Sequence, residues 1–170
     1  DMDGFNLIMY TIVQIIGGIL GTIIANVEFD KPWVEVSTKD RYQYNLWISE
    51  IIGTMTLLLI IHSCVRTGQK AMVPWAVGGW ICGGYFFTSS TIFANPAVTI
   101  ARMLTNTFAG IEPRSAGVFI CFQLIGALLA YPLIKLFYPH NLAMKKDDNL
   151  YLRVCIQQNN KLNYELADEV

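Results

Sequence analysis

The chain has 170 residues, of which 54% are hydrophobic and 15% are charged, against about a quarter charged in soluble domains. A net charge of −1 excludes the strongly basic surface of a nucleic-acid-binding protein, and the four cysteines lack metal-binding or disulfide-framework spacing. Glu50 is the one charged residue inside four long apolar stretches of the sequence, residues 4–27, 42–65, 71–101 and 115–134. This composition indicates an integral membrane protein and excludes most soluble enzymes.

The first two stretches predict membrane-spanning helices over about residues 5–27 and 46–65. About 20 apolar residues are needed to cross a hydrocarbon core of about 30 Å. In the first helix, Gly17 and Gly21 have the four-residue spacing that lets a neighbouring helix approach closely. The linker between the helices, residues 28–41, is charged and long enough to cross part of a membrane face.

The third stretch, residues 71–101, would measure about 46 Å as a single helix, which is too long for one span. Asn95 and Pro96 form a strong helix start inside it. We therefore expect a span over about residues 71–87, then a loop, then a half-helix over about residues 96–106 that begins within the membrane. Such a re-entrant element occurs where protein buries the non-helical backbone or a water-filled cavity solvates it. The alternative is that Asn-Pro marks an ordinary turn in a surface loop.

The last stretch predicts a span over about residues 116–138, and it repeats a pattern found in the first. Gln123 and Gly126 are spaced as Gln14 and Gly17 are, within eight-residue segments that are alike throughout. Two predicted spans lie between the copies, so the copies cross the membrane in opposite directions. This arrangement is typical of inverted repeats, which place a solute path near the membrane midplane.

Several motifs occur in a family-specific order. They are Glu50-Ile51-Ile52-Gly53-Thr54, Ala94-Asn95-Pro96-Ala97, and Phe108-Ala109-Gly110-Ile111 followed by Gln123 and Gly126. Together they resemble the fourth helix, the second Asn-Pro-Ala box and the sixth helix of the aquaporin and glycerol-facilitator family, the major intrinsic proteins. The resemblance implies a right-handed all-α bundle fragment with four transmembrane helices and one re-entrant half-helix, assembled as a homotetramer. It covers the third helix and the second half of the family fold, so we expect an N-terminally truncated chain.

By this resemblance, Asn95, Pro96 and Ala97 belong to the pore. Unpaired N–H groups at the start of the half-helix and the Asn95 amide can donate to a passing water or polyol oxygen, whereas a cation meets an electrostatic barrier. Pro96 fixes the first turn without leaving an orphan N–H group.

The selectivity filter departs from the family pattern. The family's usual arginine lies three residues after the box asparagine, where this chain has Val98. The other filter positions fall at Gly83, or Gly84 if the loop differs by one residue, and at Ile92. A wider, less polar constriction would suit larger uncharged solutes such as glycerol or metalloid hydroxides like arsenite. Arg102 either lines a vestibule or extends its charge to the membrane interface.

Glu50 is the one charge predicted inside a span, and buried carboxylates in membranes are paired or stabilise irregular backbone. The resemblance implies that Glu50 is a structural brace that accepts backbone N–H bonds from the loop before Asn95. The alternative, a proton relay, would need titratable partners at depth, and His62 is the candidate.

These observations predict a multi-pass channel of the plasma or inner membrane that passes water or small uncharged solutes. They predict no enzyme activity, cofactor, metal or nucleic-acid partner. The alternative is a truncated, non-conducting protein that only associates with other subunits. We expect residues 5–138 to form the transmembrane domain and residues 139–170 to form a polar tail.

Overall fold

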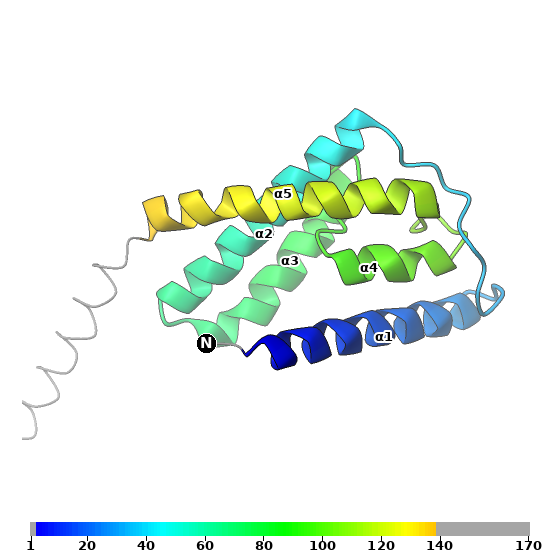
Figure 1. The fold of residues 1–170 in the computed structure, drawn as a ribbon, viewed down its shortest axis with the longest axis horizontal. Helices are drawn as coiled ribbons and strands as arrows, with labels where there is room; N and C mark the ends of the chain where they lie inside the picture. Colours follow the sequence, from blue (N-terminus) through cyan, green and yellow to red (C-terminus); the bar gives the residue numbers. More distant parts are fainter. Residues whose placement is uncertain (1–2, 139–170) are drawn as a thin grey trace, which may run out of the picture. The chain divides into compact units, whose positions relative to one another are not determined.

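The structure is a computed structural model that describes residues 3–138. In chain order its elements are α1 (Gly4–Glu28), α2 (Tyr44–Arg66), the 3-10 turn η1 (Lys70–Met72), α3 (Val73–Phe87), α4 (Pro96–Ala101), the 3-10 turn η2 (Arg102–Leu104) and α5 (Pro113–Phe137) (Figure 1). The chain divides into two compact units, residues 1–131 and 132–170, and the described part of the second is the end of α5 and residue 138. The predicted polar tail, residues 139–170, lies outside the described residues.

Among the described helices, three are long and apolar enough to cross a membrane. Helices α1 and α5 have 25 residues each and α2 has 23, with mean hydropathies of 2.1, 2.1 and 1.8. A helix of 23 residues extends about 35 Å, which exceeds the hydrocarbon thickness of about 30 Å. The prediction of an all-α membrane protein is confirmed.

Helix α3 is shorter than the span expected over residues 71–87. It has 15 residues, about 22 Å, and it begins at Val73 because Pro74 favours the first turn of a helix. The 3-10 turn η1 precedes it directly and brings the helical segment to about 28 Å. Helix α3 therefore approaches the length of a span only together with η1.

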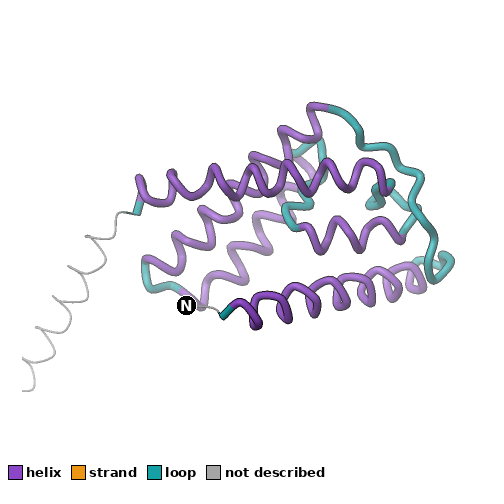
Figure 2. The backbone as a smooth tube through the Cα atoms, in the orientation of Figure 1, coloured by secondary structure: helices purple, strands orange, loops and turns teal. Residues whose placement is uncertain are grey.

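Helix α3 ends at Phe87, and a loop of residues 88–95 leads to α4 (Figure 2). Asn95 caps α4, because its Oδ1 accepts a hydrogen bond from the backbone N of Ala97 at 2.9 Å. Helix α4 has six residues, and the turn η2 extends the helical segment to Leu104. These nine residues measure about 15 Å, half of what a span needs.

Helix α1 packs against α4 and η2 through a small residue. A Cβ atom at Gly18 would lie 3.1 Å from the Ala101 Cβ, so only a residue without a side chain fits there without a shift. At Gly17 and Gly21, where the sequence predicts close packing, a Cβ would meet no atom within 4 Å. The close contact falls on Gly18 because successive helical residues point about 100° apart, and Gly18 lies on the side facing α4.

The buried positions of this fold are unusually polar, and its helix surfaces are apolar. Asn26 is the one buried residue of α1, while large apolar side chains such as Val13 and Leu128 are exposed. Glu50 and Gln123 are at most 1% exposed. A lipid environment accommodates exposed apolar side chains, whereas buried polar groups must find partners within the protein.

Candidate pore site

The loop between α3 and α4 is strained. Thr91, Ile92 and Ala94 have positive φ angles of 63°, 41° and 50°, which residues with a Cβ rarely adopt. Each such residue costs on the order of 1–3 kcal/mol, so the surroundings must hold the loop in place. Strained backbone of this kind clusters at functional sites, so this loop is the first candidate for the site.

The carboxylate of Glu50 holds this loop. Its Oε1 accepts hydrogen bonds from the Ser90 hydroxyl at 2.6 Å and from the Phe93 backbone N at 2.9 Å. Its Oε2 accepts from the Ala94 backbone N at 2.9 Å and from Gln123 Nε2 at 2.7 Å. Four donors match the acceptor capacity of an ionised carboxylate, which explains how a charge with no solvent exposure is accommodated.

Gln123 links this network to the half-helix. Its Nε2 also donates to Thr99 Oγ1 at 2.9 Å, and the Thr99 hydroxyl lies 3.0 Å from the Asn95 carbonyl oxygen. One turn further along α5, a Cβ at Gly126 would lie 2.6 Å from the Ile51 carbonyl oxygen. The missing side chain lets α5 approach α2 closely enough for Gln123 to reach the carboxylate.

Asn95 faces the other member of the repeat. Its Nδ2 lies 3.5 Å from Gln14 Oε1, a long contact, while Gln14 Nε2 donates to the Tyr10 hydroxyl at 3.1 Å. Asn95 is partly exposed, so its amide retains donor capacity for another oxygen. Gln14 and Gln123, matched by the internal repeat, thus both lie beside the half-helix segment.

Arg41 belongs to the site although no sequence signal points to it. Its side chain is 4% exposed and donates to three carbonyl oxygens: Ser90 at 2.9 Å, Phe108 at 2.9 Å and Gly110 at 2.8 Å. Burial first, and then the positive charge of Arg102, lowers the pKa of Arg41 from its ordinary value. An arginine nevertheless stays protonated in proteins. Arg41 therefore ties the linker after α1 to the loops on both sides of the half-helix.

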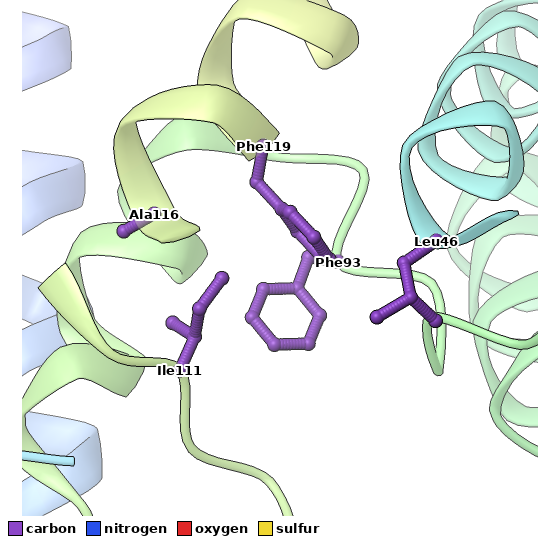
Figure 3. Close-up of a cluster of buried hydrophobic side chains, with 5 residues drawn as sticks. All are labelled: Leu46, Phe93, Ile111, Ala116 and Phe119. Carbon is purple, nitrogen blue, oxygen red and sulfur yellow. The ribbon is translucent and has the colours of Figure 1, made fainter. Parts of the chain in front are cut away.

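The Phe93 side chain anchors the strained loop in the apolar core. It packs with Leu46, Ile111, Ala116 and Phe119, and Figure 3 shows its ring surrounded by these side chains. The rings of Phe93 and Phe119 meet edge to face, with centroids 5.4 Å apart. The loop is thus held by Glu50 through its N–H groups and by this cluster through its side chain.

Two arginines lie against the same aromatic ring. The guanidinium carbons of Arg41 and Arg102 are 5.0 Å and 4.2 Å from the Phe93 centroid, and that of Arg102 is also 5.7 Å from the Tyr85 centroid. The Arg102 side chain is therefore held within the protein by two rings. Of the two sequence-based alternatives, these contacts favour a site beside the half-helix over extension to the membrane interface.

The filter positions expected from the family pattern lie in different surroundings. Ile92 is 1% exposed and fills the space left by Gly53 and Gly84, where a Cβ atom would overlap it. Gly83 directly precedes Gly84 in α3, and a Cβ atom there would lie 3.3 Å from the Phe87 ring. Val98 is partly exposed and borders a cavity. Of these three positions, Val98 alone borders this cavity, and it also packs against the apolar cluster around Phe93.

The cavity has a volume of about 340 Å³ and lies between α1 and the half-helix segment. Most of the residues that line it are small, and Arg102 is the one charged residue among them. The lining residues are Gly18, Gly21, Thr22, Ala25, Asn26, Phe29, Val98, Ala101, Arg102, Thr105, Thr107 and Ala109. A volume of this size holds a small polar solute together with several waters.

The part of the chain that the structure describes offers little support for metal binding or for a proton relay. No group of three or more His, Cys, Asp or Glu residues lies close enough to hold a metal ion there. His62 is exposed and lies twelve residues, about 18 Å, along α2 from Glu50. The distance is too long for a direct proton transfer between them.

The structure defines a multi-pass helical membrane protein in which a helix too short to cross a membrane, α4, packs against a long apolar helix. Over 126 residues, 74% of this chain, the sequence is 42% identical to the aquaglyceroporin AqpS of Rhizobium meliloti (strain 1021). The chain spans about half the length of this curated relative, 54%. No family model and no solved structure matches the chain.

This chain belongs to the aquaporin and glycerol-facilitator family, the major intrinsic proteins. The family resemblance predicted from the sequence motifs is confirmed. Its apolar helices and its bacterial relative place it in the cell membrane as a multi-pass protein.

Proposed function

We propose that this chain forms part of a passive channel for water and small uncharged solutes. The observation that carries the proposal is the strained loop of residues 88–95, which Glu50 holds beside a partly exposed Asn95. Such backbone is costly, and no enzyme-like nucleophile or base accompanies it among the described residues. The name of the relative, an aquaglyceroporin, agrees with transport of water and glycerol.

The chemistry of the loop suits neutral oxygen-bearing solutes. Glu50 uses the N–H groups of Phe93 and Ala94, so this part of the loop offers its carbonyl oxygens as acceptors. The Asn95 amide supplies a donor next to them. A hydroxyl group both donates and accepts, so water and polyols can exchange hydrogen bonds along such a surface without carrying charge.

Val98 determines the solute class in this proposal. It stands where the family has its filter arginine, and it borders the 340 Å³ cavity with an apolar side chain. A branched apolar residue there is shorter than an arginine and leaves more room at this position. We infer a broad pore whose solutes include glycerol and metalloid hydroxides such as arsenite, with Gly83 and the Ile92 backbone at the other filter positions.

The test compares water and solute fluxes in proteoliposomes that contain the product of the complete reading frame encoding residues 1–170. We expect fast glycerol and arsenite uptake, and we expect Val98→Arg to lower glycerol flux about tenfold or more while it lowers water flux less. Val34→Arg, at an exposed linker position, is the matched control. Fast water flux with no glycerol or arsenite flux in the unmodified protein would refute the broad-pore proposal.

The assembly is also a proposal. Exposed apolar faces such as that of α1 need either lipid or protein neighbours, and a homotetramer would cover part of them. Cross-linking in the membrane should give a tetramer as the largest product. If the protein inserts and oligomerises but passes neither water nor solute, the alternative of a non-conducting subunit that only associates with others holds instead.

A further inference from the structure

We propose that Arg102 takes over the role of the missing filter arginine, as the residue that rejects cations and donates hydrogen bonds to neutral solutes. This inference rests on the proposed channel function, because it assigns a specificity-determining residue to the same path. It differs from the family pattern, in which the charge stands at the position of Val98.

Arg102 follows Val98 by four residues in a continuous helical segment made of α4 and η2. Residues four apart lie on the same face of a helix, one turn above the other. Long side chains on helices point back towards the N-terminus, so the side chain of Arg102 covers the turn that contains Val98. Both residues border the same 340 Å³ cavity. Compared with the family pattern, the arginine of this chain is therefore one helical turn further along and lies on the same helix face as the filter position, Val98.

The guanidinium of Arg102 has none of the partners that a structural arginine uses. Its Nη1 is buried without a hydrogen-bond partner, and no carboxylate within the described residues forms an ion pair with it. Its contacts are the rings of Phe93 and Tyr85, at 4.2 Å and 5.7 Å. The rings hold the cation in position, and the Glu50 carboxylate attracts it from a distance without forming an ion pair. An ionisable residue of a membrane protein that lies without an ion-pair partner beside a cavity is a candidate for direct interaction with solute.

Arg41 shows the contrast and adds to the effect. Its guanidinium donates to three carbonyl oxygens, so its N–H groups are largely used in holding the loops. Its charge nevertheless lies against the same Phe93 ring as that of Arg102. Two arginines and one carboxylate, that of Glu50, leave a net positive charge near this ring, which repels a cation. A neutral hydroxyl is not repelled and can accept a hydrogen bond from Arg102 at the cavity.

The first experiment measures the accessibility of the two arginines in the membrane-embedded protein. Phenylglyoxal, a small water-soluble reagent for guanidinium groups, is applied and modification is followed by peptide mass spectrometry. We expect Arg102 to react about ten times faster than Arg41, because Arg102 borders a cavity and lacks hydrogen-bond partners. Equal reactivity, or faster reaction of Arg41, would overturn the proposal whether or not the protein conducts.

The second experiment measures sodium leak and glycerol flux in proteoliposomes for Arg102→Met and Arg102→Lys. We expect Arg102→Met to raise the ratio of sodium to glycerol permeability about tenfold or more, and Arg102→Lys to restore most of the rejection. Arg114→Met, at an exposed position at the start of α5, is the matched control. An unchanged permeability ratio in a folded Arg102→Met protein would overturn the proposal.

The two proposals fail in different ways. If the unmodified protein passes no water and no glycerol, the channel function is wrong, and the reactivity of Arg102 alone then decides whether it faces a water-filled site. If glycerol passes and Arg102→Met changes neither permeability, the channel function stands and the role of Arg102 is wrong.

Discussion

The substitution Glu50→Gln tests how the strained loop is held. The carboxylate accepts four hydrogen bonds, two at each oxygen, and glutamine has only one acceptor oxygen. The new NH2 group would face two donors, either Ser90 and Phe93 or Ala94 and Gln123. Leaving a buried donor unsatisfied costs about 1–3 kcal/mol, so two of them cost about 2–6 kcal/mol.

The loss should appear locally and in overall stability. We expect a lower thermal midpoint for the solubilised protein and faster amide hydrogen exchange at Phe93 and Ala94, measured by mass spectrometry on peptides from the loop. Glu28→Gln, at the exposed end of α1, is the control for the loss of one negative charge. The charged groups that act on Glu50 are Arg41 and Arg102, and arginine stays protonated in proteins, so the flux of the variant should remain independent of pH.

Two results would refute this reasoning. A Glu50→Gln protein whose midpoint and loop exchange match those of Glu28→Gln would show that the carboxylate does not hold the loop. A new pH dependence of flux in the variant would show that Glu50 takes part in proton movement and not only in bracing.

Two further predictions concern the packing of the site. Arg41→Gln removes three charge-assisted hydrogen bonds to carbonyl oxygens and should destabilise the protein by about 2–4 kcal/mol. Lys31→Gln, in the same linker, is the control. Equal thermal midpoints of the two variants would contradict the role of Arg41. Gly126→Ala places a Cβ 2.6 Å from the backbone carbonyl of Ile51, which cannot move aside easily, so it should cost about 1–3 kcal/mol despite the better helix propensity of alanine. Gly117→Ala, where a Cβ meets nothing within 4 Å, should be neutral or stabilising, and equal effects of the two glycine substitutions would refute the close approach of α5 to α2.

The elements around Asn95 could be predicted because their signals are local. Asparagine followed by proline favours a helix start, and a helix as short as the one that follows cannot span a membrane. The bracing role of Glu50 could also be predicted, because a single charge in a long apolar stretch needs partners, and the backbone N–H groups of an irregular segment offer them.

Arg41 could not be predicted from its place in a charged linker. Its three acceptors lie 49, 67 and 69 residues further along the chain, so only the folded arrangement brings them to it. The close contact of α1 likewise falls on Gly18 and not on the Gly17 and Gly21 pair. A four-residue spacing of glycines does not tell from which side α4 approaches α1.

The sequence by itself determined the membrane class, the position of the helix break and the family, since apolar length, Asn-Pro chemistry and motif order are properties of short segments. The tertiary structure decided which groups meet: the four donors at Glu50, the three carbonyls at Arg41, and the cavity that Val98 and Arg102 share. The sequence left Arg102 with two interpretations. Its contacts with Phe93 and Tyr85 place it at the site, because a long side chain takes its position from the rings around it.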